Sequence, residues 1–134
     1  MTLVLDTTAL LAWHLDHVDR AIVVDAAASD PDWCSSEIAL TEVLAICDRV
    51  TLDPDLSAVL RASIVHTWDF VNVVPVDADC LARAGELARD HPLRLTDAIH
   101  LAAAERLPPP VRFVTFDANQ MPVAQLLGFE LISR

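Results

Sequence analysis

The chain has 134 residues, the length of an average domain, and we expect residues 1–134 to form a single domain. Its formal net charge of −11 argues against passive electrostatic binding of nucleic acid, which needs a cationic surface. The basic residues are all arginines, so Walker A phosphate loops and Schiff-base enzymes, which need a lysine, are excluded. Two glycines are too few for a glycine-rich phosphate cradle.

Short apolar runs alternate with helix-like patterns along the chain. The expected strands are Leu3–Leu5, Trp33–Ser35, Val71–Val76, Val111–Phe116 and Phe129–Ile132. The expected helices are Thr7–Leu15, Val18–Ala28, Glu37–Val50, Asp53–Phe70, Asp77–Asp90, Asp97–Leu107 and Ala118–Leu127, with Ser36 and Thr96 as N-caps of two of them. This alternation predicts an α/β fold in which helices flank a central parallel sheet.

The cysteines and the N-terminus bear on the compartment. Cys34, Cys47 and Cys80 are odd in number and none has CxxC spacing, so we expect reduced, buried thiols in a cytoplasmic protein. We expect no signal peptide, because the N-terminus runs directly into a strand. No apolar stretch approaches the 18 or so residues that span a membrane, so no membrane role is expected.

Asp6 and Asp117 each follow a predicted strand directly. Active sites of open parallel sheets lie at the carboxyl ends of the strands, so both carboxylates should reach the same edge. Taken singly, either residue could be only an N-cap of the following helix.

Glu42 and Asp97 are acidic residues in apolar surroundings. Glu42 lies on the apolar face of the helix predicted over Glu37–Val50, where a carboxylate is costly without a partner. The alternative to a functional role is an ion pair, for example with Arg49. Asp97 opens a helix that is apolar nearly all round, and the alternative there is stabilisation by the helix dipole alone.

If these four carboxylates converge, they repel one another unless a cation neutralises them. Oxygen ligands of this kind suit Mg²⁺ or Mn²⁺, and the chain has no Cys/His cluster for zinc. Such an ion lowers the pKa of bound water, and the resulting hydroxide can attack a phosphorus atom.

Four segments together resemble the PIN domain, and more closely the VapC-type ribonuclease toxins of toxin–antitoxin pairs: Leu5–Leu10, Ser36–Val43, Leu95–Ala102 and Phe113–Asp117. The resemblance implies a PIN-like three-layer fold and a Mg²⁺-dependent endoribonuclease. The implied partners are a VapB-like antitoxin and a second copy of the chain, and the apolar content of 54% agrees with a homodimer. The family's acidic quartet falls on Asp6, Glu42, Asp97 and Asp117, its following hydroxyl on Thr8, and Asn119 is an alternative metal-shell group.

Other polar residues have weaker claims to a role. Four arginines are candidates for contact with RNA phosphates: first Arg94 and Arg112, then Arg20 and Arg49. Each of them could instead serve solubility or local ion pairing. His100, one turn beyond Asp97, is expected to be a satisfied histidine in a packed helix rather than a ligand.

Two other functions fit parts of the pattern. A phosphatase of the haloacid dehalogenase type would need an aspartate where Thr8 stands, and also a lysine, so it is disfavoured. A non-catalytic PIN-like scaffold that acts through protein contacts is the alternative that the sequence leaves open.

Overall fold

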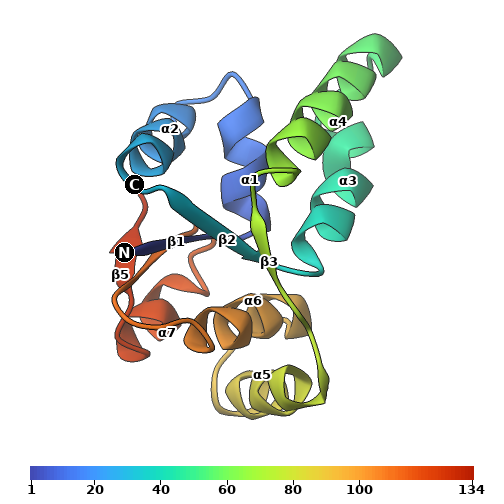
Figure 1. Ribbon diagram of the computed structural model, residues 1–134. Helices are drawn as coiled ribbons and strands as arrows, with labels where there is room; N and C mark the ends of the chain where they lie inside the picture. The colour runs from blue at the N-terminus through green and yellow to red at the C-terminus, as the bar shows by residue number, and fades with distance from the viewer.

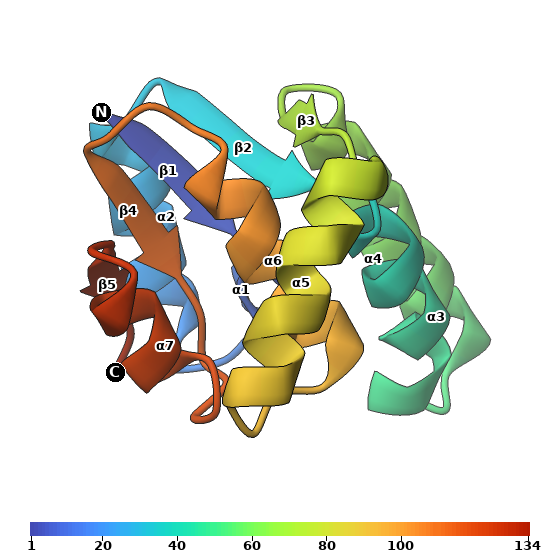
Figure 2. The same ribbon diagram turned by 90° about the horizontal axis from the view of Figure 1, so that it is seen from below.

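The computed structural model describes residues 1–134 as a five-stranded sheet with helices on both faces (Figures 1 and 2). The strands are β1 (Thr2–Leu5), β2 (Asp32–Ser36), β3 (Asn72–Val74), β4 (Val111–Val114) and β5 (Glu130–Ile132). The helices are α1 (Thr7–His14), α2 (Arg20–Ser29), α3 (Ala39–Val50), α4 (Pro54–Trp68), α5 (Ala78–Asp90), α6 (Leu95–Glu105) and α7 (Met121–Leu126). The expected α/β class is confirmed.

The strand order places a crevice beside β1. All neighbouring strands are parallel, in the order β3-β2-β1-β4-β5, and Leu3 of β1 pairs with Trp33 on one side and Arg112 on the other. The chain therefore runs outward from β1 to β3 and then returns to the opposite side of β1 for β4. In open parallel sheets, ligands bind at such a reversal, outside the carboxyl ends of the two strands.

Two apolar cores separate the layers. Successive side chains of β1 point to opposite faces, so Leu3 and Leu5 join the core under α1 to α4, whereas Val4 joins the core under α5, α6 and α7. Figure 1 shows the first group of helices above the sheet and the second group below it. None of the helices combines the length and the apolar character needed to cross a membrane.

Helix α6 carries its polar residues into the interior. Every residue from Asp97 to Ala104 is buried. Apart from Asp97 and His100, this stretch consists of apolar residues, most of them alanines. Alanine allows close approach between helices, and α6 packs along α5 (Figure 2). Asp97 and His100 are thus held on a tightly packed element rather than on a loop.

Two predicted N-caps, Ser36 and Thr96, are wrong. Ser36 ends β2 instead of capping α3, which begins at Ala39, because the Ser36 hydroxyl is bonded to His100. The helix predicted from Asp97 begins at Leu95, because the Arg94 carbonyl already accepts a helical hydrogen bond from the Ala98 N–H. Thr96 therefore lies inside α6 and is not its N-cap.

Two predicted strands are too long. β3 ends at Val74, before Pro75, which has no N–H to donate to a neighbouring strand. β4 ends at Val114, and the Phe116 N–H binds the hydroxyl of Thr8 instead of a strand. The residues after β4 thus turn toward the start of α1.

Candidate active site

A small cavity of about 110 Å³ lies at the carboxyl ends of β1 and β4, where α3 from one layer meets α6 from the other. Parts of the chain that are far apart in sequence contribute to it. Its lining consists mainly of polar side chains: Asp6, Thr7, Thr8, Glu42, Ile46, Arg94, Asp97, His100 and Gln120. The structure therefore brings three of the four predicted carboxylates to one place, and these three are Asp6, Glu42 and Asp97.

Asp6 is fully buried and caps α1, so the capping and the functional readings of this residue are compatible. One carboxylate oxygen accepts from the Ala9 N–H at 2.9 Å and from the Thr8 hydroxyl at 2.7 Å. The other accepts from the Thr115 hydroxyl at 2.6 Å and from the Gln120 amide at 3.0 Å. Burial nevertheless raises the pKa of Asp6, and these hydrogen bonds only partly offset it.

Glu42 is held by a buried histidine and not by Arg49. Its Oε1 atom lies 2.9 Å from His100 Nε2 and also accepts from the Thr7 hydroxyl. The hydrogen bond from His100 is the main reason that the pKa of Glu42 falls to about 2. Glu42 is therefore an ionised carboxylate at neutral pH.

Asp97 and Asp117 share one cation, the guanidinium of Arg94. Arg94 donates to both carboxylate oxygens of Asp97, at 3.0 and 3.2 Å, and reaches Oδ2 of Asp117 at 3.4 Å. The Asp97 side chain is only 3% exposed, whereas that of Arg94 is 71% exposed. Asp117 thus belongs to the rim of the cavity and is linked to its interior through Arg94.

Gln120 lies between the two innermost carboxylates. Its amide nitrogen donates to Asp6 at 3.0 Å and to Asp97 at 3.2 Å. Its amide oxygen is buried and has no hydrogen-bond partner. Unpaired buried oxygens are rare, and this one adds a neutral oxygen donor to a set of carboxylates.

The donor set fits a hard divalent cation, which is bound in proteins by carboxylate and amide oxygens. No three His, Cys, Asp or Glu side chains close around a common point as a preformed metal site. The amide of Gln120 and the guanidinium of Arg94 lie between the carboxylates and take up their hydrogen bonds. A bound cation would replace these donors.

The model of the PIN domain family matches residues 3–134. The chain belongs to the PIN domain family. The expectation of a PIN-type fold is thereby confirmed, since the match covers nearly the whole chain.

The solved structures with the same fold include a toxin and members of toxin–antitoxin systems. VapC20 of Mycobacterium tuberculosis, a toxin that cleaves the sarcin-ricin loop, is 18% identical, with a TM-score of 0.72 over 91% of this chain and 95% of that one. VapBC-5 of the same organism is 20% identical, with a TM-score of 0.65 and full coverage of both chains. A toxin–antitoxin complex from Klebsiella pneumoniae is 19% identical, with a TM-score of 0.68 over 90% of each chain. No curated protein matches the chain.

Two predicted residues of this PIN domain lie away from the cavity. Asn119 is exposed, and its backbone N–H binds Asp117, but its side chain lines a different hollow beside α7. Arg112 of β4 pairs with Glu130 of the edge strand β5 at 3.8 Å, two residues before β4 ends. In the cavity, Gln120 takes the place that was expected for Asn119.

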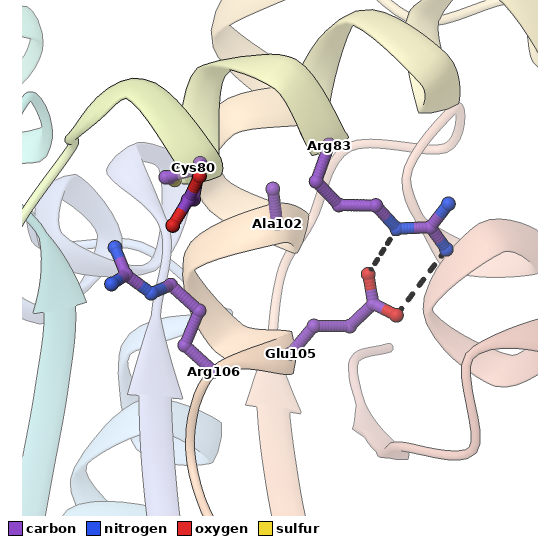
Figure 3. A pocket seen from close by; sticks show the side chains of 6 residues that line it. Cys80, Arg83, Ala102, Glu105 and Arg106 are labelled. Carbon is purple, nitrogen blue, oxygen red and sulfur yellow. Dashed lines mark hydrogen bonds and ion pairs between the residues drawn. The ribbon is translucent and has the colours of Figure 1, made fainter.

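A second hollow of the PIN domain, about 240 Å³ in volume, lies between α5 and α6 (Figure 3). Two arginines border it, but each is already paired: Arg83 donates to Glu105, as the dashed lines show, and Arg106 to Asp77. No charge is left free to recognise an anion. Asp77 also caps α5 by accepting from the Cys80 N–H.

Sequence reasoning missed several polar groups around the carboxylates. Thr115 and Gln120 flank Asp117 in the chain, and both bind Asp6. Ser36 has the residue type of a helix cap and binds His100 instead. The available signal was position, because Ser36 ends β2, Thr115 and Gln120 come after β4, and both strands neighbour β1 in the sheet.

Proposed function

We propose that this PIN domain is a Mg²⁺-dependent endoribonuclease of the VapC type, which hydrolyses RNA phosphodiester bonds. The observation that carries the proposal is the cavity in which Asp6, Glu42 and Asp97 meet at the crevice beside β1. Gln120, whose buried amide oxygen has no hydrogen-bond partner, lines the same cavity. Carboxylates gathered in one cavity repel one another, and a divalent cation would relieve that repulsion.

PIN nucleases generally use divalent metals, and Mg²⁺, with Mn²⁺ as a substitute, fits the oxygen donors present. Asp6, Asp97, Glu42 and Asp117 would hold the metal. When bound, it would lower the pKa of a coordinated water and stabilise negative charge on phosphate oxygens. No histidine base is then required.

The remaining polar groups either connect the segments around the cavity or are candidates for binding the RNA. Thr8 donates to Asp6 and accepts from the Phe116 N–H, so it ties the start of α1 to the segment after β4. The exposed side chain of Arg94 lies at the rim of the cavity. It is our candidate for contact with RNA phosphates when a metal ion replaces it as the partner of Asp97. Arg112 is a lesser candidate, because it is paired in the sheet.

We further propose a VapB-like antitoxin as partner, a homodimer as the state of the free toxin, and the cytoplasm as the place of action. The structural neighbours include toxin–antitoxin complexes from several bacteria. Large apolar side chains are exposed along α4 and just before it, which supports a surface that a protein partner covers: Leu52, Leu56, Val59 and Val65.

The test is cleavage of RNA by the purified chain. The panel should contain transfer RNA, messenger RNA and a sarcin-ricin hairpin, since VapC20 cleaves that loop. We expect cleavage with Mg²⁺, none with excess EDTA, and recovery when Mg²⁺ or Mn²⁺ is added back. The new ends should be 5′-phosphate and 3′-hydroxyl.

Two results would contradict the proposal. Cleavage that persists in EDTA, or that leaves 2′,3′-cyclic phosphates, would show attack by the RNA's own 2′-hydroxyl. No cleavage of any RNA by a folded protein that binds metal would favour the non-catalytic scaffold.

A further inference from the structure

We propose that His100 is a positioning residue that sets how far the Glu42 carboxylate reaches into the cavity. The inference rests on the proposed function, because it concerns the geometry of the metal site. From its sequence context, His100 is expected to be only a satisfied histidine in a packed helix. The histidine is indeed satisfied, and the groups that satisfy it include a carboxylate of the site.

His100 is 1% exposed, and both of its ring nitrogens are engaged. Nδ1 lies 2.8 Å from the Ser36 hydroxyl at the end of β2. Nε2 lies 2.9 Å from Oε1 of Glu42 and 3.1 Å from the Thr7 hydroxyl at the start of α1. The imidazole therefore bridges the sheet, α1 and α3.

The proton positions follow from the partners. The oxygens of a carboxylate can only accept, so the 2.9 Å contact with Glu42 requires Nε2 to be the donor. The Ser36 hydroxyl can then donate to Nδ1. A carboxylate–histidine–hydroxyl chain of this kind fixes the ring and, through it, the Oε1 atom of Glu42.

The position of His100 on α6 couples it to Asp97. The two residues are three apart and lie on the same side of the helix, one turn from each other. Glu42 projects from α3, in the opposite layer, and its side chain is long and 25% exposed. Helix α6 thus places one carboxylate directly and restrains a second one through the imidazole.

Two replacements of His100 separate positioning from packing. In His100→Gln the amide nitrogen can occupy the place of Nε2 and still donate to Glu42. In His100→Asn the amide occupies the place of Nδ1, so the Ser36 contact is kept and the Glu42 contact is lost. The measurements are Mn²⁺ affinity by calorimetry, kcat and KM for a cleaved RNA, and the melting temperature.

We expect His100→Gln to keep Mn²⁺ affinity and kcat within about threefold of wild type. We expect His100→Asn to lose at least about tenfold in both, with KM nearly unchanged, because groups that orient metal ligands typically contribute 10- to 100-fold. Equal losses in the two variants at equal melting temperatures, or no loss in His100→Asn, would overturn the inference.

A third variant covers the case in which both replacements of this buried ring fail to fold. Ser36→Ala removes only the partner of Nδ1. It should weaken Mn²⁺ binding several-fold in the wild-type background and have no effect in a Glu42→Gln background. The same loss in both backgrounds, or none in either, would show that the imidazole does not act through Glu42.

The failure of this inference can be told apart from the failure of the proposed function. A wild-type chain that binds no Mn²⁺ and cleaves no RNA refutes both. A wild-type chain that does both, beside a His100→Asn variant that equals it, refutes only the positioning role.

Discussion

The hydrogen bonds of Asp6 and its burial have opposite effects on the stability of its ionised form. Asp6 caps α1 and accepts hydrogen bonds from Thr8, Ala9, Thr115 and Gln120, which stabilise its ionised form. Its complete burial nevertheless raises its pKa. A group whose pKa is higher in the folded state contributes stability at low pH that is lost as the pH rises through that value, so burial of Asp6 costs the metal-free protein stability at higher pH.

We therefore expect Asp6→Asn to raise the melting temperature of the metal-free protein at neutral pH by a few degrees. The same variant should lose the further stabilisation that Mg²⁺ gives to the wild-type chain. Thermal unfolding with EDTA and with Mg²⁺ measures both effects. A variant several degrees less stable than wild type in EDTA would show that the hydrogen bonds to Asp6 outweigh its burial.

Glu42 has the opposite pH dependence. Its pKa falls from 4.5 to about 2, chiefly through the hydrogen bond from His100. A carboxyl whose pKa is lower in the folded state stabilises the fold fully above its unfolded value and loses this contribution as the pH falls toward the folded value. The relevant window therefore runs from about 4.5 down to about 2.

We expect wild type to be more stable than Glu42→Gln by about 1–2 kcal/mol near neutral pH, after allowance for screening of the part-exposed carboxylate. The difference should shrink below about pH 4.5, as Glu42 takes up its proton. Urea unfolding of both proteins across that window measures it. Two parallel curves would mean that the His100 contact does not stabilise ionised Glu42.

Arg94 competes with any cation for Asp97 and Asp117. Its guanidinium contacts both carboxylates, and the hydrogen bonds to Asp97 are the main cause of its raised pKa. We expect Arg94→Gln to bind Mn²⁺ several-fold more tightly and to show a several-fold higher KM for RNA. Calorimetry and steady-state kinetics test the two halves, and weaker Mn²⁺ binding in the variant would contradict the competition.

At the scale of helices and strands, the sequence predicts much of the fold. Apolar runs and turn residues locate all five strands and seven helices, because most local preferences agree with the final structure. The errors fall at the boundaries of elements, and several of these boundaries lie beside the cavity. Ser36 and Thr96 have the residue type of helix caps, but Ser36 serves His100 across the sheet and Thr96 lies inside α6.

The residues of the candidate site also fall into those that the sequence predicts and those that it does not. Asp6 and Asp117 could be placed from the ends of their strands, and Glu42 from its apolar surroundings. Gln120 and His100 could not be assigned, because their partners are 23 to 114 residues away in sequence. Local patterns carry no information about which distant side chain will satisfy a buried polar group.

Helix α5 offers a test of packing that leaves the cavity untouched. Gly85 lies on an exposed part of this helix, where an added methyl group would meet no atom within 4 Å, whereas its neighbour Ala84 is fully buried. Gly85→Ala should stabilise the protein by about 0.5–1 kcal/mol, and Ala84→Leu should destabilise it by about 1–3 kcal/mol. Urea unfolding decides, and a stable Ala84→Leu variant would mean that the interface of α5 and α6 is loosely packed.

On the scale of the whole molecule, the protein and its proposed substrate, RNA, are both negatively charged. A chain with a net charge of −11 repels RNA, and no lysine offsets this. Neutralisation of the carboxylates by a divalent cation reduces the repulsion at the place where the phosphate must approach. We therefore expect RNA binding that is weak and depends on the metal.

The central claim is that the acidic cavity binds a divalent ion and cleaves RNA with it. Its most direct test is the cleavage rate of Asp97→Asn in saturating Mg²⁺. Asp79→Asn is the matched control, since Asp79 is exposed on α5, outside this cavity. We predict that Asp97→Asn folds normally and loses cleavage by at least about a hundredfold, whereas Asp79→Asn cleaves like wild type. Cleavage by Asp97→Asn at the wild-type rate would contradict the account.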